Sequence, residues 1–97
     1  MSELEKARKD IERIDREMAK LFEERMRAVE EVAAYKKEKG LPVKDPEREK
    51  QLIEKNTAHI ANVAYKPYYI RFEKALFRVS SEYQKRLIGD AADEKKV

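Results

Sequence analysis

The sequence has no cysteine and only one histidine, His59. Disulfides and thiolate metal sites are therefore excluded, and a single histidine cannot build a zinc site by itself. No apolar run approaches the roughly 20 residues that span a bilayer, and the N-terminal residues contain no apolar signal core. These absences predict a cytoplasmic protein that does not enter a membrane.

An excess of one charge is also missing. The 23 basic and 20 acidic side chains leave a net charge of +3, which is too balanced for a protein that binds nucleic acid through bulk electrostatics. Charged residues make up 44% of the chain, but the apolar residues between them are regularly spaced. This pattern is typical of helices with solvated outer faces rather than of disorder.

Glycine and proline are scarce, and neither occurs in residues 1–39. That stretch is rich in strong helix formers and predicts one long helix. A rod of roughly 50 Å cannot bury a whole apolar seam against two short helices of its own chain. We therefore expect a second copy of the chain to cover the seam. The seam occupies two heptad positions, one with Leu4, Ile11, Met18 and Val32, the other with Ala7, Ile14, Leu21, Ala28 and Tyr35.

The first glycine marks the end of the long helix. Gly40 stands at the position of a C-terminal cap, and a short loop with Pro42 follows it. Asp45 is expected to cap a second helix that has Pro46 at its first position and runs to about Val63.

A third helix is expected from about Pro67 to just before Gly89. The polar residues 90–97 are expected to form a disordered tail outside a single domain of residues 1–89. The predicted fold class is therefore all-α, with one long and two shorter helices per chain. The inward side chains of the shorter helices are expected to be Leu52, Ile53, Ile60, Val63, Tyr69, Phe72, Leu76, Val79, Tyr83 and Leu87.

One cation interrupts the apolar seam of the long helix. Arg25 takes a heptad position between Met18 and Val32, where a guanidinium is costly unless it is paired or binds an anion. A snorkelling side chain or an internal pair with a glutamate would also explain it. Lys36 lies about 20° from Arg25 around the helix axis and roughly 16 Å along it, so the two side chains can grip one small anion. Arg8 lies roughly 25 Å from Arg25 along the axis and can reach such a site only in a partner chain.

Two further polar clusters follow. Asp45, Arg48 and Glu49 stand at a helix N-terminus, where free N–H groups favour an anionic or hydroxylated ligand. Alternatively, Asp45 only caps the helix, and Arg48 and Glu49 form a solvated ion pair on its surface. Ser80 and Gln84 are four residues apart and share one face of the third helix. They are neutral hydrogen-bonding residues, and a polar helix boundary is their alternative explanation.

Taken together, these residues resemble the all-α (AroQ) class of chorismate mutases, over a stretch from about Leu4 to Leu87. The resemblance implies a three-helix subunit in an intertwined homodimer, with two pockets that are each completed by Arg8 of the other chain. It also implies a dianionic small-molecule substrate, chorismate, and no cofactor. The eight polar positions that carry the resemblance are Arg8, Arg25, Lys36, Asp45, Arg48, Glu49, Ser80 and Gln84.

The resemblance also implies a division of roles. Arg25, Arg48 and the partner's Arg8 would bind the two carboxylates of chorismate, assisted by Ser80. The reaction is an intramolecular Claisen rearrangement, which needs no proton transfer and no covalent intermediate. The protein therefore has to orient the substrate and to meet the charge that develops on the ether oxygen. Lys36 and Gln84 would donate hydrogen bonds to the ether oxygen. Glu49, with the backbone around Asp45, would orient the ring hydroxyl.

Other functions stay open at this point. An isochorismate-pyruvate lyase shares the fold, although Asp45 and Glu49 favour the mutase. A non-catalytic helical dimerisation module would explain the seam but not Arg25. A mutase domain cut from a larger fused enzyme of the aromatic pathway is also compatible with the sequence.

Overall fold

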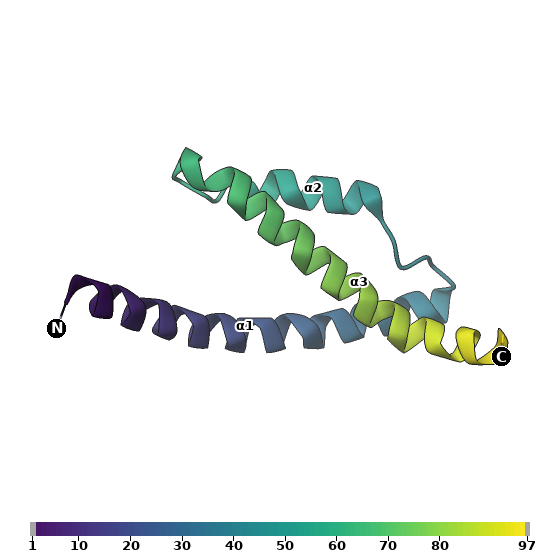
Figure 1. Ribbon diagram of the computed structural model, residues 1–97. Coiled ribbons are helices and arrows are strands. Elements are labelled where there is room, and N and C mark those ends of the chain that lie inside the picture. Colours follow the sequence, from purple (N-terminus) through teal and green to yellow (C-terminus); the bar gives the residue numbers. More distant parts are fainter. Residues whose placement is uncertain (1, 97) are drawn as a thin grey trace.

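The computed structural model describes residues 2–96. Three α-helices, α1 (Glu3–Lys39), α2 (Pro46–Thr57) and α3 (Lys66–Lys96), are joined by short segments, and a 3-10 turn, η1 (Val63–Tyr65), precedes α3. No strand occurs within residues 2–96, so the predicted all-α class is confirmed. Figure 1 shows α3 crossing the C-terminal half of α1, with α2 lying along the other end of α3.

Both ends of α1 have local caps. The Ser2 hydroxyl accepts a hydrogen bond from the backbone N–H of Glu5 at 3.1 Å. Gly40 adopts the left-handed conformation, with φ of 67°, and its N–H donates to the carbonyl of Lys36. Leu41 N–H donates to the same carbonyl at 2.9 Å. The cap predicted at Gly40 is therefore confirmed, and it turns the chain back beside Lys36.

The start of α2 agrees with the sequence and its end does not. The Asp45 carboxylate accepts from the backbone N–H of Arg48 at 3.1 Å, with Pro46 at the first helical position. The helix then stops at Thr57 rather than near Val63. Residues 56–59 are mostly weak helix formers. The Asn62 side chain also accepts from the N–H of Ala64 at 2.9 Å and starts η1 instead.

The third helix is longer than predicted. It starts at Lys66 with Pro67 in its first turn, where a missing N–H is tolerated. It passes Gly89 and reaches Lys96, because a single interior glycine costs a helix only about 1 kcal/mol. The division into a domain of residues 1–89 and a polar tail of residues 90–97 stays a prediction. The side chains from residue 90 onward and Val97 lie outside the described part of the structure.

The apolar core of the described chain is small and lies where α1 and α3 cross. Val29, Ala33 and Phe77 are its buried apolar side chains. Within a single chain, Phe72, Val79 and Leu87 of the core stripe predicted for α3 are exposed. The most buried face of α3 is largely polar, because the crossing turns a different stripe inward. That stripe consists of Glu73, Phe77, Ser80, Ser81 and Gln84.

A single chain is elongated and leaves the apolar seam of α1 uncovered. Its extents are 57 × 27 × 22 Å and its radius of gyration is 17.3 Å, against about 12.5 Å expected for a compact chain of this length. Leu4, Ile11 and Leu21 of the seam are all more than half exposed. Within the described residues, no helix has the length and apolarity needed to cross a membrane.

Candidate active site

A cavity of about 220 Å³ lies between the C-terminal half of α1, the start of α2 and the middle of α3. All three α-helices therefore contribute to one small space. Its apolar wall contains Val29, Val32, Val43, Leu52 and Phe77. The structure brings seven of the eight predicted site residues to this cavity: Arg25, Lys36, Asp45, Arg48, Glu49, Ser80 and Gln84.

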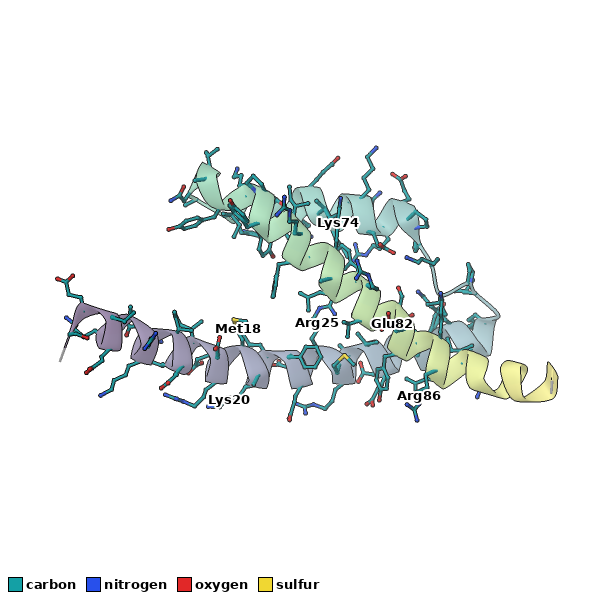
Figure 2. The ribbon with its side chains drawn as sticks, viewed as in Figure 1. Met18, Lys20, Arg25, Lys74, Glu82 and Arg86 are labelled. Atoms are coloured by element: carbon teal, nitrogen blue, oxygen red, sulfur yellow. The ribbon has the colours of Figure 1, made fainter. Side chains whose placement is uncertain are left out.

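Arg25 bridges α1 and α3. Its guanidinium donates a hydrogen bond to the Ser80 hydroxyl, which in turn donates to the carbonyl of Leu76 at 2.8 Å. Figure 2 shows Arg25 reaching from α1 into the space below α3. Its hydrogen-bond partner among the described residues is thus a neutral hydroxyl, and the alternative pair with a glutamate is not formed there. No carboxylate of the described residues therefore neutralises the positive charge in the seam.

Lys36 is held by the loop that follows α1. Its ammonium donates to the carbonyl of Val43 at 2.8 Å, and its own carbonyl accepts from the capping N–H groups of Gly40 and Leu41. Backbone and side chain of Lys36 are therefore tied to the same short loop. This arrangement points the ammonium into the cavity while leaving two of its three protons available to a ligand.

The start of α2 supplies one cation and two carboxylates. Asp45 caps the helix by accepting from the backbone N–H of Arg48. The exposed guanidinium of Arg48 has no carboxylate partner among the described residues. The half-buried Glu49 lies 4.0 Å from the ammonium of Lys44. The cavity therefore combines two carboxylates with three cations that have no acidic partner among the described residues. Such a set favours a ligand that carries negative charge together with a hydroxyl group.

The second half of α3 adds two buried polar side chains, Ser81 and Gln84, which are each only 8% exposed. The Oε1 atom of Gln84 is buried and has no hydrogen-bond partner in the described residues. Ser81 was not among the residues predicted from the sequence. It lies three residues before Gln84 and therefore near the same helix face, which is the signal that could have indicated it.

Arg8 lies apart from the other seven. It is exposed on the N-terminal part of α1 and does not line the cavity. The 17 residues that separate it from Arg25 in one continuous helix correspond to roughly 25 Å along the axis. The structure of one chain therefore does not bring Arg8 to the candidate site.

Two tyrosines of α3 have altered acidity. The Tyr83 hydroxyl donates to the Glu30 carboxylate and joins α3 to α1 beside the cavity, and this hydrogen bond raises the pKa of Tyr83. Burial raises the pKa of Tyr69 to about 12, with smaller contributions from its hydrogen bond to Glu73 and from the charge of that residue. Within the described residues, no group of three or more histidine, aspartate or glutamate side chains could hold a metal ion.

A family model for chorismate mutase type II matches residues 7–85. The chain belongs to the chorismate mutase type II family. The predicted resemblance is thus confirmed, and the matched range contains all eight predicted site residues, from Arg8 to Gln84.

Two relatives illustrate how this chorismate mutase type II chain compares with named proteins. It is 40% identical over 55 residues to the bifunctional chorismate mutase/prephenate dehydratase of Aquifex aeolicus. It is 38% identical over 55 residues to the chorismate mutase of Methanocaldococcus jannaschii. Each alignment covers 57% of this chain, with 15% of the first relative and 56% of the second. The match thus spans less than two thirds of either relative. No solved structure gives a significant match.

Proposed function

We propose that this chain is an isomerase that rearranges chorismate to prephenate in the biosynthesis of phenylalanine and tyrosine. The observation that carries the proposal is the cavity in which Arg25, Lys36 and Arg48 converge without acidic partners among the described residues. Chorismate is a dianion with a hydroxyl group. The cavity offers cations, carboxylates and an amide in a space of about 220 Å³, and membership of the family supports the assignment.

The residue types suit the reaction. In the rearrangement the ether C–O bond breaks while a C–C bond forms within one molecule, and negative charge develops on the ether oxygen. Lys36 and Gln84 would donate hydrogen bonds to this oxygen that are stronger in the transition state than in the ground state. The Val43 carbonyl, at 2.8 Å from the Lys36 ammonium, would hold this donor in place before the substrate arrives.

The remaining site residues would hold the substrate in a reactive conformation. Arg25 and Arg48 would each grip a carboxylate, since a guanidinium binds carboxylates through two parallel hydrogen bonds. Ser80, already bonded to Arg25, would assist. Glu49 would accept a hydrogen bond from the ring hydroxyl, with the backbone near Asp45 beside it. Fixing the flexible enolpyruvyl arm over the ring removes most of the entropic part of the barrier.

We also propose that the active form is a homodimer in which each chain supplies Arg8 to its partner's cavity. The exposed seam of α1 and the large radius of gyration support this arrangement. A second, apolar groove of about 480 Å³ lies along the same helix and includes Met18, Leu21, Phe22 and Phe72. A partner's α1 packed antiparallel in this groove would bury the seam and would carry Arg8 toward the cavity.

The loss of chorismate absorbance, with prephenate as the sole product, tests the proposed activity directly. Turnover by the purified protein is expected without added metal or cofactor. Absence of turnover by the wild-type protein would rule out the mutase. Formation of salicylate and pyruvate from isochorismate would assign the same cavity to the lyase reaction instead.

A further inference from the structure

The cavity contains one buried acceptor that nothing in the described structure satisfies, the Oε1 atom of Gln84. The proposed function uses the other end of this amide, the Nε2 group, as a donor to the ether oxygen. A half-turn of the amide exchanges the two ends. If Oε1 faced the substrate, it would lie against the ether oxygen, and neither of these two oxygens can donate a hydrogen bond. Catalysis therefore requires that a donor holds Oε1 on the side away from the ether oxygen.

Ser81 is placed to be that donor. It lines the same cavity three residues before Gln84, and it is 8% exposed. Residues three apart on a helix are neighbours, and long helical side chains lean toward the N-terminus. The amide of Gln84 therefore extends over the turn that contains Ser81. The Ser81 hydroxyl makes no hydrogen bond to any described residue, so its proton is available.

The other donors of the cavity are the engaged hydroxyl of Ser80 and cations that a bound dianion would need. The single proton of the Ser80 hydroxyl is donated to the Leu76 carbonyl at 2.8 Å, and its oxygen accepts from Arg25. Lys36 donates to the Val43 carbonyl at 2.8 Å. A cation that turned to Oε1 would also be withdrawn from the charges of a bound dianion. A neutral hydroxyl has no such cost.

We propose that the Ser81 hydroxyl donates a hydrogen bond to Oε1 of Gln84 and thereby turns Nε2 toward the reacting ether oxygen. The bond forms by rotation about the side-chain bonds of Gln84 and leaves the backbone of α3 in place. Ser81 is thus a positioning residue that acts through Gln84, and this inference rests on the proposed function.

Steady-state kinetics with chorismate tests the inference. Loss of one such hydrogen bond should lower kcat of Ser81→Ala by about three- to tenfold with little change in KM. Ser81→Thr keeps the hydroxyl and should retain most of kcat. In a Gln84→Ala background, Ser81→Ala should have no further effect, because its target is gone. Thr57→Ala is the matched control, since the buried Thr57 hydroxyl in α2 lies outside the cavity and has no partner among the described residues.

Three kinetic results would overturn the inference. These are an unchanged kcat for Ser81→Ala, an effect confined to KM, or an equal loss of kcat whether residue 84 is glutamine or alanine.

A second readout does not depend on turnover. A hydrogen bond to the amide oxygen strengthens the partial double bond of the amide. NMR exchange between the two Nε2 protons of Gln84 should therefore be faster in Ser81→Ala than in wild type, Ser81→Thr or Thr57→Ala. Unchanged exchange would refute the bond, whereas inert wild-type protein would refute the proposed function alone.

Discussion

The ammonium of Lys36 lies 2.8 Å from the carbonyl oxygen of Val43, so the last turn of α1 and the loop before α2 are joined by a side chain as well as by the helix cap. The partner is a neutral carbonyl, which orients the cation without cancelling its charge. Lys36 therefore lines the cavity with a fixed direction, which suits its proposed role as a donor to a developing anion.

Replacement of this ammonium should abolish most of the activity. Lys36→Met keeps much of the length of the side chain but removes the donor, and kcat for chorismate should fall about 10²- to 10³-fold. Lys37→Met, one residue away on the exposed surface of α1, should keep wild-type kcat. Circular dichroism of both variants should show unchanged helix content. Equal rates for the two variants would exclude Lys36 from the reaction.

The two glycines should respond to alanine in opposite directions. A Cβ would meet nothing within 4 Å at either position, but Gly40 has φ of 67° and Gly89 lies within α3. Gly40→Ala should lose about 1–2 kcal/mol of unfolding free energy from the left-handed conformation. Gly89→Ala should gain about 1 kcal/mol from helix propensity. Urea denaturation at one protein concentration measures both, and a stabilising Gly40→Ala would contradict the proposed capping conformation.

Features that depend on nearby residues were predictable from the sequence. The caps at Gly40 and Asp45 follow from local hydrogen bonds, and they set both ends of the loop that joins Lys36 to Arg48. Helical spacing also placed Arg25 and Lys36 on one side of α1. These local signals account for the part of the cavity built by α1, the loop and α2, whereas Ser80 and Gln84 reach it through the crossing of α3 with α1.

Features that depend on how helices cross were not predictable. The apolar pattern of α3 favoured Phe72 and Val79 as core residues, whereas the crossing with α1 buries Glu73, Ser81 and Gln84 instead. No local rule gives the angle at which one helix meets another. The end of α2 at Thr57 was missed because weak helix formers and the Asn62 side chain compete with an apolar pattern that continues.

A charge placed in the seam of α1 should separate the proposed dimer. Figure 2 shows Met18 and Lys20 on opposite sides of α1, and Met18 also lines the apolar groove. Met18→Asp would bury an unpaired carboxylate in the interface, which is strongly unfavourable. Sedimentation velocity should show a monomer for Met18→Asp and a dimer for the control Lys20→Asp. A dimer of unchanged affinity for Met18→Asp would place the interface elsewhere.

The raised pKa of Tyr69 should make stability fall at high pH. Its value is about 12 in the folded chain against 10.0 for the free side chain. The folded state thus keeps the phenolic proton after the unfolded state has lost it. The resulting stabilisation is fully present below pH 10 and is lost as the pH rises toward 12. The free energy of unfolding should fall over this interval by more in wild type than in Tyr69→Phe. Parallel curves would contradict the shift.

Subunit mixing tests whether Arg8 acts across the dimer. If each cavity takes Lys36 from one chain and Arg8 from the other, Arg8→Ala and Lys36→Ala homodimers each contain two damaged cavities. A mixed dimer concentrates both lesions in one cavity and leaves the other intact. Random exchange of an equal mixture should therefore restore about one quarter of the cavities. Chorismate turnover before and after exchange measures the gain.

The expected gain has a strict control. Arg25→Ala and Lys36→Ala remove residues that line the cavity of the same chain, so every cavity in their mixed dimers carries one lesion and mixing should restore nothing. Restoration for the Arg8 pair but not for the Arg25 pair would require a shared cavity, because independent subunits cannot exchange side chains. If neither pair regains activity while exchange is verified by a mass tag on one chain, Arg8 acts within its own chain or not at all.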